Sequence, residues 1–123
     1  MIKLFYYSDA VPFLTYGETA VEKLEENLEL LRKQSDSVHL IWHLRNGTGD
    51  ILRSNGSEVA DRLEFIRSEY IRLGAGELNE DPEGSPGFYE AISGCDAYYG
   101  DPSDACCYAQ LNGIPAMIQG FFK

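Results

Sequence analysis

The chain has 123 residues, 44% of them hydrophobic, and a formal net charge of −10. This length and apolar content suffice for one hydrophobic core, so we expect a single domain spanning residues 1–123. The acidic balance argues against nucleic acid and anionic membranes as partners, because both are bound through clustered Lys and Arg. With no leader pattern and no run of about 20 apolar residues, we expect a cytoplasmic protein without a membrane span.

The three cysteines do not form a disulfide framework, because their number is odd and two of them, Cys106 and Cys107, are adjacent. A reducing compartment fits this pattern. No cysteine pairs with a histidine at the spacing of a zinc site. We therefore expect neither a metal nor an organic cofactor.

The beginning of the chain predicts a strand followed by a helix. Residues 2–7 are β-formers, and Ser8, Asp9 and a loop through Pro12 end the strand. A helix is predicted over residues 17–34, where Thr15 and Glu18 have the spacing of a capping box. Its apolar residues recur on one face, namely Val21, Leu24, Leu28 and Leu31.

The next segment repeats this alternation. A strand is predicted over residues 38–42, a polar loop over 46–56 and a helix over 57–73. Gly74 and Gly76 end this helix. The apolar stripe of the helix is formed by Val59, Leu63, Ile66, Tyr70 and Leu73.

The second half of the chain contains shorter elements. Strands are predicted over residues 76–79, 97–100 and 115–119. Helices are predicted over residues 86–93 and 102–112, the first opened by a proline and the second ended by Gly113.

Alternating strands and helices predict an α/β fold with a doubly wound, five-stranded parallel sheet in three α/β/α layers. We expect the strand order 3-2-1-4-5, with four helices covering both faces. Ligands of such sheets bind at the carboxyl ends of the strands, beside the point where the order reverses. The candidate residues are Ser8, Asp9, His43, Arg45, Glu80, Asp81, Asp101, Ser103, Asp104 and Gln119.

The most specific string runs from Cys95 to Asp104 and reads Cys-Asp-Ala-Tyr-Tyr-Gly-Asp-Pro-Ser-Asp. It is followed over residues 112–119 by Asn-Gly-Ile-Pro-Ala-Met-Ile-Gln. Together with the opening Tyr-Tyr-Ser-Asp, these strings resemble the C-terminal, donor-side half of bacterial GT-B proteins related to the CDP-glycerol glycerophosphotransferases. The resemblance is collinear along most of the chain. It implies a Rossmann-like domain that binds a nucleotide-activated sugar or polyol.

In that family the fourth loop and the following helix cradle the donor phosphates, so the resemblance implies that Ser103 would hydrogen-bond a phosphate. A helix N-terminus suits this task because it offers free N–H groups and a partial positive charge. Where the family has a second serine, this chain has Asp104. Because a carboxylate repels phosphate, we expect weak phosphate binding at this helix end.

A second departure follows the second strand, where the relatives carry Trp-Arg-Pro-His-Pro. This chain has His43 at the expected arginine position and Arg45 at the expected histidine position. One imidazole and one guanidinium can still bind a phosphate or a carboxylate. A hydrogen-bonded structural role is the alternative for His43, and His39, inside the strand, is expected to be structural.

A GT-B enzyme works in the cleft between two such domains, and the resemblance implies that this chain begins at the first strand of the second one. Two hypotheses follow. In the first, the chain is the donor-nucleotide-binding half of a glycosyl- or polyol-phosphate transferase that needs a separate acceptor-domain partner and is inactive alone. In the second, it is a non-catalytic, degenerate GT-B-like domain that binds a ligand or a protein.

Other chemistries have weaker support in the sequence. Aspartates at the strand ends could bind Mg²⁺, but acidic residues are common there in such folds. A phosphoacceptor receiver domain would need a lysine after the last strand, where this chain has Gln119. A nucleoside deoxyribosyltransferase would need a glutamate in the helix after the fourth strand, and residues 104–112 contain none.

Overall fold

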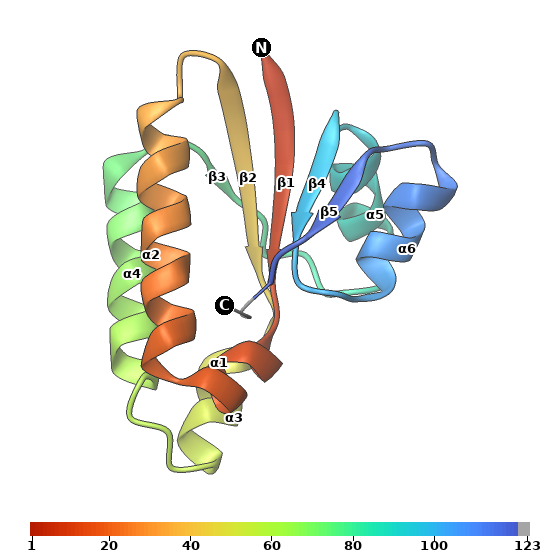
Figure 1. The fold of residues 1–123 in the computed structure, drawn as a ribbon. Coiled ribbons are helices and arrows are strands. Elements are labelled where there is room, and N and C mark those ends of the chain that lie inside the picture. Colours follow the sequence, from red (N-terminus) through yellow and green to blue (C-terminus); the bar gives the residue numbers. More distant parts are fainter. Residues whose placement is uncertain (121–123) are drawn as a thin grey trace.

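A five-stranded sheet lies at the centre of the computed structural model, which describes residues 1–120 (Figure 1). All paired strands are parallel, and their order is β3-β2-β1-β4-β5, as the sequence predicted. The order reverses between β1 and β4, as in doubly wound, Rossmann-like folds. The strands are β1 (Ile2–Ser8), β2 (Val38–Leu44), β3 (Glu77–Leu78), β4 (Ala97–Gly100) and β5 (Ala116–Ile118).

Helices flank the sheet on both sides, which confirms the predicted three-layer α/β/α architecture. The first four helices lie on one side and the last two on the other (Figure 1). In the described part of the chain, no helix combines the length and the apolar character needed to cross a membrane. The helices are α1 (Ala10–Tyr16), α2 (Glu18–Lys33), α3 (Thr48–Ser54), α4 (Ala60–Leu73), α5 (Pro86–Ser93) and α6 (Asp104–Leu111).

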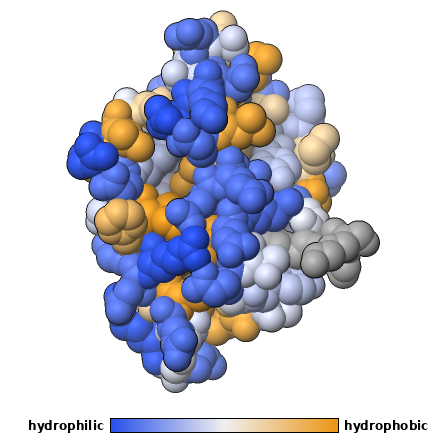
Figure 2. Space-filling model, turned by 60° about the vertical axis from the view of Figure 1, so that its left-hand side comes forward, coloured by the Kyte–Doolittle hydropathy of each residue, from blue (hydrophilic) through white to orange (hydrophobic). Residues whose placement is uncertain are grey.

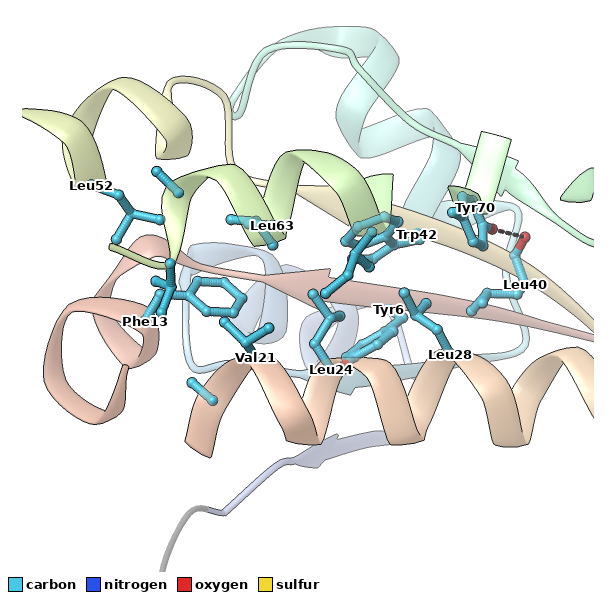
Figure 3. Close-up of a cluster of buried hydrophobic side chains, with 14 residues drawn as sticks. Tyr6, Phe13, Val21, Leu24, Leu28, Leu40, Trp42, Leu52, Leu63 and Tyr70 are labelled. Atoms are coloured by element: carbon cyan, nitrogen blue, oxygen red, sulfur yellow. Dashed lines mark hydrogen bonds between the residues drawn. The ribbon is translucent and has the colours of Figure 1, made fainter. Parts of the chain in front are cut away.

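The larger hydrophobic cluster lies between the sheet and the helices α2 and α4 (Figure 3). Leu24 of α2 and Leu63 of α4 point into it from the two helices, and Trp42 of β2 is completely buried between them. The Trp42 ring packs edge-on against Tyr70, with ring centroids 5.1 Å apart. Burial of each such side chain stabilises the fold by about 1.5–3 kcal/mol. The two predicted helical stripes therefore pack on one face of the sheet, as expected.

The central strand β1 is buried on both of its faces, because successive side chains of a strand point to opposite sides. Tyr6 belongs to the cluster under α2 and α4. Phe5 and Tyr7 belong to a second cluster, which α5 and α6 cover with Phe88 and Ile92 among others. This double burial explains why β1 is apolar and aromatic over most of its length rather than alternating.

Helix α1 replaces part of the loop predicted after β1. Pro12 is the third residue of this helix, where its missing N–H breaks no intrahelical hydrogen bond. The predicted capping box of Thr15 and Glu18 is wrong, because Thr15 lies inside α1. Gly17 separates the two helices with a φ of +53°, and no side chain within residues 1–120 caps α2.

Helix α3 replaces part of the polar loop predicted over residues 46–56. Gly47 precedes it in a left-handed conformation, with a φ of +82°. The Thr48 hydroxyl donates to the carbonyl oxygen of Arg45 at 2.6 Å and so closes the first turn. The completely buried Leu52 anchors this short helix in the larger cluster, a tertiary contact that the polar local sequence does not reveal.

The remaining predicted bounds differ from the structure by a few residues. Helix α4 begins at Ala60 instead of Ser57, and α6 begins at Asp104 after its N-cap, Ser103. Leu73, predicted as the last member of the α4 stripe, is 49% exposed. It lies in the final turn of α4, beyond the reach of the core.

Candidate functional site

The carboxyl ends of β1 and β4 approach each other very closely. Tyr7 pairs with Gly100, and a Cβ atom added at Gly100 would lie 2.1 Å from the carbonyl oxygen of Tyr7. Gly100 also has a φ of +144°, which side-chain-bearing residues rarely adopt. The backbone N–H of Asp101 donates to the same carbonyl oxygen at 3.0 Å. The loops after β1 and β4 are therefore held against each other beneath the candidate site.

Asp101 is a buried carboxylate that joins these loops to the end of β5. One oxygen accepts a hydrogen bond from the backbone N–H of Asp9 at 2.7 Å, and the other accepts one from Nε2 of Gln119 at 2.6 Å. Burial raises the pKa of Asp101, and these two hydrogen bonds act in the opposite direction. With only 2% of its surface exposed, Asp101 positions other residues instead of facing a ligand.

Ser8 and Gln119 direct their polar atoms into the protein. The Ser8 hydroxyl oxygen accepts a hydrogen bond from Nε1 of Trp42 at 3.0 Å. The side-chain oxygen of Gln119 accepts hydrogen bonds from the Tyr6 hydroxyl and from Nδ2 of Asn27, both at 3.3 Å. Both residues thus satisfy buried groups on the α2 side of the sheet.

His43 is completely buried and joins the end of β2 to the loop that follows β3. Its Nδ1 lies 2.8 Å from Oδ1 of Asn79, and its Nε2 lies 2.5 Å from Oε2 of Glu83. The imidazole stacks on the Tyr7 ring, with centroids 5.6 Å apart and planes inclined by 10°. These contacts assign His43 a structural role, the alternative considered for it from the sequence.

Arg45 forms the polar edge of the site together with Asp9. Nη1 of Arg45 lies 3.3 Å from Oδ1 of Asp9, and the Tyr7 hydroxyl donates to Oδ2 of Asp9 at 3.1 Å. The Asp9 charge raises the pKa of Arg45. Burial, with a further contribution from Asp9, raises the pKa of Tyr7 well above its ordinary value, so the phenol remains a neutral donor. The guanidinium is therefore already partly neutralised within the protein.

A pocket of about 340 Å³ opens above this network, between the loop after β1 and the N-terminus of α6. Among residues 1–120, three carboxylates and one guanidinium line it, and together these four groups carry a negative charge. Aromatic side chains form part of its wall, and the ring of Tyr89 packs on Tyr108 with centroids 4.5 Å apart. The residues that matter most for its chemistry are Asp9, Arg45, Glu83, Tyr89, Ser103 and Asp104.

The N-terminus of α6 is capped by the protein itself. Oγ of Ser103 accepts a hydrogen bond from the backbone N–H of Ala105 at 3.1 Å and lies 3.3 Å from the Tyr98 hydroxyl. Asp104 is exposed in the first helical turn, where its charge is favourable to the helix dipole. A phosphate at this position would compete with the Ser103 cap and meet the Asp104 carboxylate.

Asp81 lies outside the pocket. Its carboxylate accepts a hydrogen bond from Nδ2 of Asn79 at 3.1 Å and lies against Gly87, where an added Cβ would come within 3.0 Å of it. The neighbouring Glu80 pairs with Arg67 on α4. Among residues 1–120, no group of three or more His, Cys, Asp or Glu side chains is arranged to hold a metal ion.

The structure divides the predicted site residues into three sets. Four of them line the pocket: Asp9, Arg45, Ser103 and Asp104. Another four are buried and hydrogen-bonded: Ser8, His43, Asp101 and Gln119. The remaining two, Glu80 and Asp81, are exposed and do not line the pocket.

Sequence reasoning missed several pocket residues, among them Tyr7, Glu83 and Tyr89. Tyr7 precedes the strand end, and a register prediction could have placed it opposite the fourth strand. Glu83 lies in an acidic stretch, and its contact with His43 spans 40 residues. No local pattern indicates a contact over that separation.

No family model, curated protein or solved structure matches this chain.

What the site can bind is therefore inferred from the arrangement of its own residues. In the described part of the chain, every buried side-chain nitrogen and oxygen has a hydrogen-bond partner. The polar groups beneath the pocket are thus committed to holding the loops in place. The groups that face the pocket can bind a ligand through charge, hydrogen bonds and aromatic contact.

Proposed function

We propose that this chain is a non-catalytic binding domain whose pocket receives a small ligand with a cationic group. The charge balance of the pocket carries this proposal. Asp9, Glu83 and Asp104 contribute three carboxylates, and Arg45, the single basic residue that lines the pocket within the described part of the chain, is paired with Asp9. An ammonium or guanidinium group that enters the pocket would therefore be attracted by its negative electrostatic potential.

Asp104 is the carboxylate most available to such a ligand. Within residues 1–120 it forms no ion pair, in contrast to Asp9 and Glu83, which contact Arg45 and His43. The partly buried ring of Tyr89 lines the same pocket. A cation between a carboxylate and an aromatic ring gains both a charge-assisted hydrogen bond and a cation–π contact.

Calorimetric titration of the purified chain tests this proposal, with arginine amide as the cationic probe and CDP as the anionic one. We expect arginine amide to bind more tightly than CDP. Asp104→Asn, which preserves shape and removes charge, should weaken arginine amide binding about three- to fivefold. Glu90→Gln, an exposed change on α5 outside the pocket, should leave the affinity unchanged. Tighter binding of CDP, or equal affinity in wild type and Asp104→Asn, would overturn the proposal.

A second candidate is the donor-nucleotide-binding half of a glycosyl- or polyol-phosphate transferase. It is supported by the position of the pocket beside the β1/β4 reversal and by the N-terminus of α6 in its wall. In this case a separate acceptor-domain chain would complete the enzyme, and the isolated chain would be inactive. Asp104→Ser would then bind CDP or UDP more tightly than wild type, and Arg45→Ala would bind it more weakly. Unchanged nucleotide affinity in both variants at matched ionic strength would exclude this candidate.

A further inference from the structure

A groove of about 530 Å³ runs between α2 and α4 on their outer surface. Figure 2 shows this face, where apolar surface is visible between charged side chains. The groove lies on the opposite side of the sheet from α5 and α6, which border the pocket described above (Figure 1). Its apolar lining includes Leu28 and Leu31 from α2 and Phe65, Ile66, Tyr70 and Leu73 from α4.

Two of these side chains leave much of their apolar surface exposed to solvent. Phe65 is 64% exposed and Leu73 is 49% exposed, whereas Leu28 and Ile66 beneath them are buried. Large apolar side chains that line a concave surface and are rimmed by polar residues are typical of protein interaction sites. A partner that covers the groove would remove Phe65 and Leu73 from water without disturbing the packing below.

The rim of the groove is strongly acidic. Glu22, Glu25, Glu26 and Glu29 lie along α2, and Glu69 lies on α4. Three of these five are neutralised by arginines, because Glu25 pairs with Arg62, Glu29 with Arg32 and Glu69 with Arg72. Among the described residues, Glu22 and Glu26 form no ion pair. They are one helical turn apart and therefore leave two free carboxylates on the same edge.

The dimensions of the groove fit a helix. The lining residues of α2 extend from Glu22 to Arg32, a distance of about 15 Å along the helix axis. This length accommodates nearly three turns of a helix, which would present apolar side chains at positions i, i+3 or i+4, and i+7 to the groove.

We propose that the groove between α2 and α4 binds one basic amphipathic helix of a partner protein. Apolar residues of that helix cover Phe65 and Leu73, and its flanking Lys or Arg side chains pair with Glu22 and Glu26. The charge of the rim selects this occupant. A second copy of the chain would bring another net charge of −10 against an acidic rim, and an anionic membrane would be repelled.

Fluorescence anisotropy with the full chain tests this proposal, using a dye-labelled Leu/Lys peptide of about 15 residues that forms an amphipathic helix. A peptide of the same composition, with the order changed to remove the apolar face, is the control. We expect the amphipathic peptide to bind at least about tenfold more tightly than its control. Equal binding of the two peptides would reduce the interaction to nonspecific charge attraction and overturn the proposal.

Two pairs of variants locate the binding. Phe65→Ala should weaken binding of the amphipathic peptide, whereas Ile71→Ala, at a residue that is 54% exposed on α4 but lies outside the groove, should not. The double variant Glu22→Lys/Glu26→Lys should weaken binding of the amphipathic peptide at least about tenfold. The control double variant Glu90→Lys/Asp50→Lys changes the net charge by the same amount at sites far from the groove and should change the peptide affinity only slightly. Equal losses within either pair would contradict the groove as the binding site. Thermal melting of each variant verifies that it is folded.

Discussion

At the scale of single residues, the candidate site depends on buried groups that do not line the pocket. Gly100 lets β4 approach β1, and Asp101 then fixes the loop that carries Asp9. The sequence analysis singled out Asp101 as a candidate, and Gly100 precedes it in the Asp-Ala-Tyr-Tyr-Gly-Asp string. It could not show that Asp101 is a buried cross-link, because that role depends on Gln119, which is 18 residues away.

The variant Gly100→Ala tests the close approach of the two strands. Because its Cβ would collide with the Tyr7 carbonyl oxygen, we expect the free energy of unfolding to fall by about 3 kcal/mol or more. Gly113→Ala is a suitable control, since its φ is also positive, at +72°, but nothing lies within 4 Å of an added Cβ. The control should lose only about 1–2 kcal/mol from backbone strain. Urea unfolding measures both values, and similar losses would argue against the steric account.

The buried carboxylate of Asp101 predicts a specific dependence of stability on pH. Its pKa is raised in the folded chain, so the folded state holds the proton more tightly than the unfolded state. The contribution of Asp101 to stability is therefore complete below the ordinary Asp pKa of about 3.9 and is lost as the pH rises through the raised value. The free energy of unfolding of wild type minus that of Asp101→Asn should fall over this range. Urea unfolding at a series of pH values measures it, and a rising difference would contradict the assigned burial effect.

At the scale of helices and strands, periodicity predicted the elements that pack along their whole length. The stripes of α2 and α4 were visible because the buried residues recur every three or four positions. Helices α1 and α3 are only seven residues long, too short for such a pattern. Pro12 in α1 and Gly47 before α3 favour a loop locally, and the buried Phe13 and Leu52 override that preference through tertiary contacts.

A matched pair of substitutions on α2 tests which face of this helix is buried. Leu24 is 2% exposed, so Leu24→Ala should lower the free energy of unfolding by about 2–5 kcal/mol through lost burial and the cavity left behind. Leu30 is 59% exposed on the same helix, and Leu30→Ala should change stability by less than about 0.5 kcal/mol. Chemical denaturation of both variants provides the comparison. A similar cost for the two would mean that the helix is rotated from the arrangement described here.

At the scale of the whole molecule, the position of the candidate pocket could be predicted, but the full set of groups that line it could not. The strand order alone places a ligand near the reversal between β1 and β4, and the pocket lies there. Which polar groups face it depends on how the loops fold back. His43 and Ser8 end in buried hydrogen bonds, whereas Glu83 reaches the pocket from a loop that showed no motif.

The outer groove between α2 and α4 also emerges only at this scale. Glu22 and Glu26 lie on one helix, and Phe65 and Leu73 lie on another. In the sequence, the glutamates look like an ordinary solvent-exposed helix face, and the apolar residues look like part of a core-facing stripe. Side by side, they form an apolar groove with an acidic edge.

Titration of the ¹⁵N-labelled chain with arginine amide and with CDP, followed by amide chemical shifts, tests the account of the pocket most directly. We predict that arginine amide causes saturable shifts at Asp9, Tyr89 and Asp104, and that CDP causes none that saturate below the millimolar range. Saturable shifts at the same residues with CDP, together with no response to arginine amide, would contradict the cation-binding pocket.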